Sequence, residues 1–164
     1  MNNAPRSQDF RIEEAESSDD IERIRQLFRA YADWLNVDLC FQGFEEELQA
    51  LPGAYIPPKG RLLLARMKGE IVGCVGLRPL SDDVCEMKRL WVEPGFSGYG
   101  IGRALAEAIV DAGRDLGYRA MRLDTFPDRL KAAGHLYDTL GFREIPDYYP
   151  NPLEGVVMYE LAYR

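Results

Sequence analysis

Three glycines at alternate positions, Gly98, Gly100 and Gly102, mark the stretch of this sequence whose residue types are best suited to bind a ligand. They follow a partly alternating segment at 85–92 and precede a segment whose apolar residues recur with helical spacing. Glycine allows backbone conformations that a Cβ atom would block, so several N–H groups can turn toward one point. At the start of a helix those donors and the helix dipole favour an anion, and phosphate is the commonest biological one. The pattern therefore predicts a phosphate-binding loop between a strand and a helix.

The spacing of the glycines separates this loop from two common nucleotide-binding motifs. A dinucleotide fingerprint needs its third glycine three positions after the second, and Arg103 occupies that place. A Walker loop ends in Gly-Lys-Ser/Thr, which does not follow here. Asp124 lies about 20 residues past the glycines, as a ribose-binding acid would. A nucleotide-dependent oxidoreductase is therefore one alternative. The spacing of the glycines and the long segment from Glu93 to Ser97 between strand and loop argue against it.

Two stretches carry a resemblance to one enzyme family. Residues 97–102 resemble the pyrophosphate loop of the GNAT superfamily of acyl-CoA-dependent N-acetyltransferases: Arg or Gln, two residues, Gly, one residue, then Gly or Ala. Ser97 stands where the family usually has Arg or Gln, which removes a side-chain contact. Residues 133–142 resemble the closing helix of the same superfamily, with Ala, two residues, Leu-Tyr and a final Gly-Phe. Leu130 occupies a position where the family often has Asn.

The resemblance implies an N-acetyltransferase that uses acetyl-CoA as cosubstrate and no metal. The acetyl group would pass to a primary amine of a small molecule, peptide or protein by direct attack in a ternary complex. The pantetheine would pair with backbone groups of Leu90, Trp91 and Val92, where a bulge splays the strand from the next parallel one. The pyrophosphate would lie against Ser97, Gly98, Tyr99, Gly100, Ile101 and Gly102, with Arg103 close enough to help. A non-catalytic acyl-CoA-binding regulatory module on the same fold is the alternative, because Ser97 and Leu130 depart from the family pattern.

Acyl transfer from a thioester to an amine needs a base for the amine, a donor for the developing oxyanion and a proton for the departing thiolate. Under the resemblance, a backbone N–H among residues 90–92 polarises the thioester carbonyl, and the Tyr137 hydroxyl is the general acid. Glu86 is the leading candidate for the base, because several relatives carry a glutamate at this position of the strand. Asp124, at the end of the following strand, or a water molecule is the other candidate. His135, the only histidine, is expected to be solvated.

The acceptor is expected to bind between the segment after the first strand and a late loop, as in the family. Asp38, Glu45, Asp147, Tyr148 and Tyr149 in these segments could form an acidic, aromatic pocket for a cation. Ordinary surface and aromatic packing is the alternative. The identity of the acceptor, and the use of an acyl group other than acetyl, do not follow from the sequence.

Hydrophobic periodicity and turn residues predict the elements that must position these residues. We expect strands at 10–15, 61–67, 70–77, 85–92, 119–124, 142–145 and 156–163. We expect helices from the Ser17–Ser18 cap to Leu35, at 43–51, from 101 to Gly117, and at 130–140. This order indicates an α/β or α+β domain. The resemblance narrows it to the GNAT fold, a mixed twisted sheet of about six to seven strands with helices on both faces.

Length and composition limit the class of protein. The 164 residues are expected to form one domain, 1–164, whose first eight residues are disordered. A net charge of -7 without a basic cluster argues against nucleic-acid binding. No apolar run approaches the roughly 20 residues of a membrane span, and no secretion signal appears, so the expected location is cytoplasmic. Cys40, Cys74 and Cys85 are expected to be free thiols rather than metal ligands. Exposed edge strands in this fold also allow a homodimer.

Overall fold

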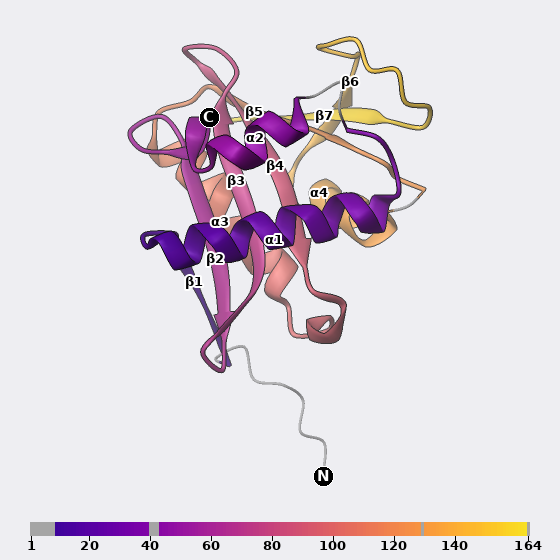
Figure 1. Ribbon diagram of the computed structural model, residues 1–164. Helices are drawn as coiled ribbons and strands as arrows, with labels where there is room; N and C mark the ends of the chain where they lie inside the picture. The colour runs from indigo at the N-terminus through magenta and orange to yellow at the C-terminus, as the bar shows by residue number, and fades with distance from the viewer. Residues whose placement is uncertain (1–8, 40–42, 129, 164) are drawn as a thin grey trace.

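The computed structural model describes residues 9–39, 43–128 and 130–163, and it shows a seven-stranded sheet with helices on both faces (Figure 1). The strands are β1 (Phe10–Glu14), β2 (Arg61–Met67), β3 (Glu70–Pro79), β4 (Val84–Val92), β5 (Ala120–Thr125), β6 (Arg143–Ile145) and β7 (Val157–Ala162). The helices are α1 (Ser18–Leu35), α2 (Phe44–Ala50), α3 (Ile101–Asp115) and α4 (Lys131–Leu140). The expected fold class is confirmed. The expectations for residues 1–8 and for Cys40 lie outside the described residues.

The strands lie in the order β1-β2-β3-β4-β5-β7-β6, and β4 and β5 are the parallel neighbours in an otherwise antiparallel sheet. A parallel pair needs a crossover connection, and α3 supplies it. β1 and β6 form the two edges of the sheet. The homodimer expected through such edges stays a prediction.

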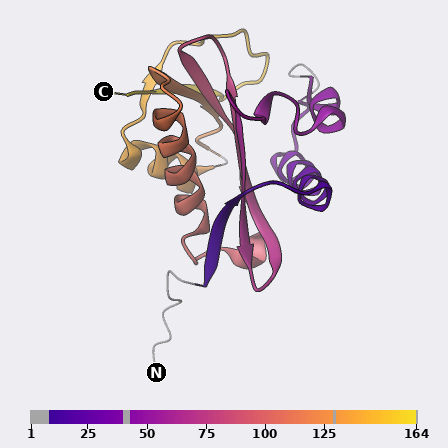
Figure 2. The same cartoon turned by 90° about the vertical axis from the view of Figure 1, so that its left-hand side faces the viewer.

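Two hydrophobic cores lie on opposite faces of the sheet (Figure 2). On one face, α1 and α2 cover a core that includes Phe28, Leu48 and Cys74. On the other face, α3 and α4 cover a core that includes Leu105 and Cys85. Both cysteines are buried free thiols, as expected. Burial raises the pKa of Cys85 to about 12, so this thiol is unreactive in the folded protein.

Local sequence signals set the ends of several elements. Ser17 caps α1 in a capping box, since its hydroxyl accepts from the Asp20 N–H and the Asp20 carboxylate accepts from the Ser17 N–H. Asn36 ends α1 in the left-handed conformation at φ 53°. Lys68 and Gly69 form the hairpin turn between β2 and β3 with φ of 51° and 82°, as the two-residue turn requires. In the part of the chain that the structure describes, no helix is both long and apolar enough to cross a membrane. The cytoplasmic location stays a prediction.

Candidate active site

Strands β4 and β5 separate toward their carboxyl ends. Their ladder pairs Val84 with Ala120 and ends at Glu86, which pairs with Arg122, whereas β4 continues to Val92. β5 meanwhile stays paired with β7 along its whole length. The carboxyl half of β4 therefore lies beyond its ladder with β5. Backbone groups at such a strand edge can pair with an extended ligand.

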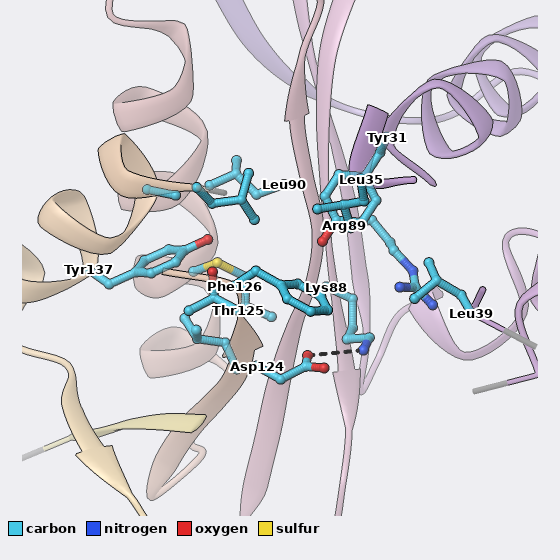
Figure 3. A pocket seen from close by; sticks show the side chains of 14 residues that line it. Tyr31, Leu35, Leu39, Lys88, Arg89, Leu90, Asp124, Thr125, Phe126 and Tyr137 are labelled. Carbon is cyan, nitrogen blue, oxygen red and sulfur yellow. Dashed lines mark hydrogen bonds and ion pairs between the residues drawn. The ribbon is translucent and has the colours of Figure 1, made fainter. Parts of the chain in front are cut away.

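A β-bulge in β4 decides which of its side chains face each helix layer. Two residues, Arg89 and Leu90, lie opposite the single residue Val75 of β3, and Arg89 has a φ of 60°. Without the extra residue, side chains would alternate strictly between the faces. With it, Lys88 and Arg89 both lie on the α1–α2 side (Figure 3). Leu90 packs toward the α3 core, and Trp91 packs toward the α1–α2 core. The bulge thus places two cations next to each other at the opening of the sheet.

Helix α2 holds the bulge through a buried ion pair. The Arg89 Nε and Nη2 atoms donate to the two carboxylate oxygens of Glu47, at 3.1 and 3.2 Å. The Arg89 guanidinium also lies over the Phe44 ring, 4.9 Å from its centroid. The two charged side chains are only 3% and 10% exposed. Burial acts to raise the pKa of Glu47, but Arg89 and Arg78 outweigh it and hold this pKa below its ordinary value. The pair stays charged and ties α2 to β4.

A cavity of about 40 Å³ lies where β4 and β5 separate, and we name it the Tyr137 cavity (Figure 3). It is lined by Tyr31, Leu35, Leu39, Met87, Lys88, Arg89, Leu90, Leu123, Asp124, Thr125, Phe126, Leu130, Ala133 and Tyr137. Tyr137 comes from α4, and its hydroxyl points across the cavity toward Leu90 (Figure 3). Burial raises the pKa of Tyr137 above its ordinary value, so the phenol keeps its proton. This hydroxyl is placed to donate a hydrogen bond or a proton into the cavity.

The glycine loop lies at the start of α3. Gly98 and Gly100 have φ of 86° and 81°, which L side chains rarely adopt. Gly100 is the N-cap of α3 and supplies no side-chain bond to the first turn. N–H groups at an uncapped helix start are suited to an anion. The Ser97 hydroxyl donates to a carbonyl of the preceding turn at 3.1 Å, and Arg103 pairs with Glu107 on the exposed surface at 2.9 Å.

The other residues expected to contact the cofactor divide between the core and the surface. Trp91 is buried against Tyr31 and Trp34, with ring centroids 6.0 and 5.6 Å away. Leu90 and Val92 are half-buried on the α3 side. In the loop, Ile101 is buried, while Tyr99 and Gly102 are half-buried. Leu90, Trp91 and Val92 would therefore meet a cofactor mainly through their backbone.

Glu86 lies buried in β4 and not on the solvent side of the strand. Its side chain is 2% exposed. Its Oε1 accepts from the Arg78 Nε atom at 2.8 Å, and its Oε2 accepts from the Tyr148 hydroxyl at 2.5 Å. Glu86 lines a second cavity of about 260 Å³, which we name the Arg78 cavity. This cavity is lined by Arg78, Leu80, Glu86, Lys88, Tyr148, Tyr149 and Pro150.

Asp124 is held by two donors at the end of β5. Its Oδ1 lies 3.3 Å from the Lys88 Nζ atom (Figure 3). Its Oδ2 accepts from the Tyr149 hydroxyl. The Asn151 Nδ2 atom donates to the Tyr149 oxygen at 2.8 Å, so the phenol proton is directed to Asp124. Burial acts to raise the pKa of Asp124, but Lys88 and Tyr149 outweigh it and keep this pKa below its ordinary value. Asp124 is therefore ionised at neutral pH.

Lys88 connects the two cavities, because it lines both of them. Its side chain is 3% exposed. Burial lowers the pKa of Lys88, and the Asp124 carboxylate partly offsets this effect. The Lys88–Asp124 pair thus stands where a group in the Arg78 cavity would approach the Tyr137 cavity.

The structure brings together only part of the expected acidic, aromatic pocket. Tyr148 and Tyr149 lie against each other at 5.2 Å between ring centroids and each donates to a carboxylate. Asp38 and Glu45 instead line a different cavity beside α1 and α2. Asp147 is exposed on the late loop. The expected set is therefore wrong for these three acids, because the pocket walls come from β3, β4 and the late loop.

Four charged residues of the site were missed by sequence reasoning: Glu47, Arg78, Lys88 and Arg89. Lys88 and Arg89 did carry a signal, since two consecutive charges inside an alternating strand indicate a bulge or a broken pattern. Glu47 and Arg78 resemble ordinary surface residues in the sequence. His135 is exposed, as expected. Among the described residues, no group of three or more His, Cys, Asp or Glu side chains could hold a metal ion.

Comparison with known proteins gives a consistent assignment. The model of the acetyltransferase (GNAT) family matches residues 21–142. An uncharacterised N-acetyltransferase of Schizosaccharomyces pombe is 38% identical over 144 residues, which cover 87% of this chain and 88% of that protein.

Solved structures show the same fold. An acetyltransferase from Streptococcus agalactiae has a TM-score of 0.76 at 20% identity, covering 95% of this chain and 99% of that one. A GNAT family acetyltransferase from Elizabethkingia anophelis, solved with acetyl-CoA bound, has a TM-score of 0.64 at 18% identity, covering 95% and 99%. At these identities the likeness extends to the fold alone.

Proposed function

This chain belongs to the acetyltransferase (GNAT) family of N-acetyltransferases, and we propose that it moves the acetyl group of acetyl-CoA to a primary amine by direct attack in a ternary complex. One observation carries the proposal: the Tyr137 hydroxyl points into a cavity at the place where β4 leaves β5. A strand edge for an extended thioester and a proton donor for its sulfur are thus adjacent.

The residues present fit acetyl-CoA. The loop at 97–102 places two positive-φ glycines before the uncapped start of α3, and a pyrophosphate would lie on those N–H groups. Arg103 is exposed one turn away and could help. Leu90, Trp91 and Val92 present backbone groups past the end of the β4–β5 ladder for the pantetheine. Acetyl-CoA supplies the activated acyl group and a thiolate leaving group.

Tyr137 is the proposed general acid. When the amine nitrogen bonds to the carbonyl carbon, the carbon–sulfur bond breaks and the sulfur takes the phenol proton. The raised pKa of Tyr137 makes the phenol a weak acid in general, so the transfer relies on its orientation toward the sulfur. A backbone N–H among residues 90–92 is the proposed donor to the carbonyl oxygen.

Glu86 is the proposed base, and Asp124 is the alternative. The Tyr148 hydroxyl occupies the Glu86 Oε2 atom, so a proton from the amine would reach this carboxylate through that phenol or a water molecule. Asp124 is nearer to the Tyr137 cavity but has a lowered pKa, which makes it the weaker base. The Lys88 ammonium would also favour the neutral form of an amine placed beside it, because two cations repel.

The test is acceptor-dependent release of free thiol from acetyl-CoA across a panel of amines. We expect Tyr137→Phe to lower kcat by about 100-fold or more, which is the lower range for general acid catalysis. CoA affinity, measured by calorimetry, should change little because the ring stays in place. Tyr159→Phe, on β7 outside both cavities, is the matched control. Unchanged turnover in Tyr137→Phe would remove the acid assignment, and tight CoA binding without release from any amine would favour the non-catalytic module.

A further inference from the structure

We propose that the acceptor is a zwitterion, an amino acid with an apolar side chain, and that Arg78 binds its carboxylate while its amine lies beside the Lys88–Asp124 pair. The inference deepens the proposed function and rests on it.

The two cavities differ in size in a way that locates the acceptor. The Tyr137 cavity holds about 40 Å³, whereas the Arg78 cavity holds about 260 Å³. Of these two cavities, the Arg78 cavity is the one with room for the body of an acceptor molecule. Because Lys88 lines both cavities, the end of the acceptor next to Lys88 is the end that meets the thioester. That end must carry the amine.

The Arg78 cavity does not share the acidic excess of the whole protein, because Glu86 pairs with Arg78 and Asp124 pairs with Lys88. Its lining contains two cations, Arg78 and Lys88, and one carboxylate, Glu86. A third cation, Arg122, lies over the Tyr148 ring at 5.4 Å from its centroid and is itself paired with Glu160 at 2.7 Å. The chain as a whole has a net charge of -7. A cavity built for a polyamine or another simple cation would carry an excess of carboxylates, since opposite charges attract a ligand. Matched cations and carboxylates instead suit an acceptor that carries both a positive and a negative charge.

Arg78 is placed to receive the negative charge. Its Nε atom donates to Glu86, while its Nη1 atom is 3.6 Å from Glu47, longer than a hydrogen bond. The side chain is 27% exposed and lines the cavity. A guanidinium carries five N–H donors and binds a carboxylate through two of them. Arg78 can therefore keep its bond to Glu86 and hold a second carboxylate with its terminal nitrogens.

The remaining walls indicate the side chain of the acceptor. Leu80 and Pro150 form an apolar part of the cavity, and Leu80 is 40% exposed. The rings of Tyr148 and Tyr149 add aromatic surface. An apolar amino-acid side chain would cover this surface and remove it from water.

Matched acceptors test the proposal directly. Leucine, leucinamide and isopentylamine share the apolar group, and leucine alone has the carboxylate. We expect kcat/KM, corrected for the fraction of neutral amine, to be about 10- to 100-fold higher for leucine, the range of one charge-assisted contact. In Arg78→Gln the advantage of leucine over isopentylamine should disappear through KM, whereas the loss of the contact between Arg78 and Glu86 should lower kcat to the same extent for all three acceptors. Arg119→Gln, an exposed arginine, is the charge-matched control.

Each outcome separates this inference from the proposed function. Thiol release that is equal for leucine, leucinamide and isopentylamine would overturn the zwitterion and leave the acetyltransferase reaction intact. An equal loss of kcat/KM for all three acceptors in Arg78→Gln would show that Arg78 acts only through Glu86, which also overturns the assignment. Calorimetry with N-acetylleucine in the presence of CoA gives a readout without turnover, and binding no tighter than that of N-acetylisopentylamine would contradict the proposal. Release with no amine at all would overturn the proposed function itself.

Discussion

Glu47→Gln tests whether the buried ion pair behind the β4 bulge is what holds the opening of the sheet. Gln keeps the shape of Glu47 but removes its charge. The Arg89 guanidinium, 3% exposed, would then lie buried without a counter-charge, and Arg78 would lose the same neighbour. Because Arg89 is the bulge residue at φ 60°, its position also sets the positions of the backbone that is proposed to meet the pantetheine.

Breaking a buried pair by removing one partner costs about 3–5 kcal/mol, because an uncompensated charge stays in the interior. For a domain of this size each kcal/mol lowers the melting temperature by about 2–4 °C, so we expect a fall of roughly 6–20 °C. Glu46→Gln is the matched control, since Glu46 is the exposed neighbour on the same helix. A surface change of this kind should stay within about 0.5 kcal/mol.

The difference between wild type and Glu47→Gln should depend on pH. The folded pKa of Glu47 lies below its ordinary value of 4.5, so its contribution to stability is present above that value. The contribution is lost as pH falls through the lower, folded pKa. We therefore expect the two stability curves to differ at neutral pH and to converge in acid.

Urea unfolding of both variants and the wild type, followed by circular dichroism at several pH values, measures these differences. Calorimetric titration with CoA measures the effect on the cofactor site, where we expect weaker binding in Glu47→Gln alone. A loss of less than about 1 kcal/mol would place this pair among the solvated surface pairs. A difference that does not shrink in acid would contradict the assignment of the effect to the charge of Glu47.

Three other predictions concern the glycine loop, the second carboxylate and the buried thiol. Gly100→Ala should weaken CoA binding, measured by calorimetry, and should lower the free energy of unfolding, measured in urea, by about 1–2 kcal/mol, because its φ of 81° disfavours a Cβ. Gly95→Ala, at an exposed position without positive φ, is the control and should change neither quantity. Tyr149→Phe should raise the pKa of Asp124, because the carboxylate loses a donor; a carbon-13 NMR titration of the carboxyl group measures this pKa, and an unchanged value would contradict the hydrogen bond. Cys85 should resist iodoacetamide at pH 8 in the folded protein and react with it in urea, because the thiol is buried. Mass spectrometry of the Cys85 peptide measures the labelling, and rapid labelling of the folded protein would contradict the burial.

Much of the fold could be predicted from local sequence signals. The apolar period along 18–35 and the serine before it are sufficient for α1, and Lys68–Gly69 is sufficient for the hairpin, because capping and turn chemistry act within a few residues. The glycine loop and Tyr137 were also accessible, since each lies in a short motif. The pairing of β5 with β7 and the place of β6 at the edge were seen only in the structure, because strand order depends on contacts between distant segments.

For the candidate site too, features set by residues close in the sequence could be predicted, whereas contacts between distant segments could not. The sequence by itself indicated that the glycine loop could bind a phosphate, and the resemblance to a family motif led to the prediction that Tyr137 donates a proton, because both features lie within one loop or one helix. Only the tertiary structure decided that Glu86 is buried between Arg78 and Tyr148, and that Lys88 stands beside Asp124. These partners come from different strands and a late loop, and the bulge at Arg89 turns two of the charges to one face. The sequence gives the charge of each side chain, but the fold decides which opposite charge lies next to it.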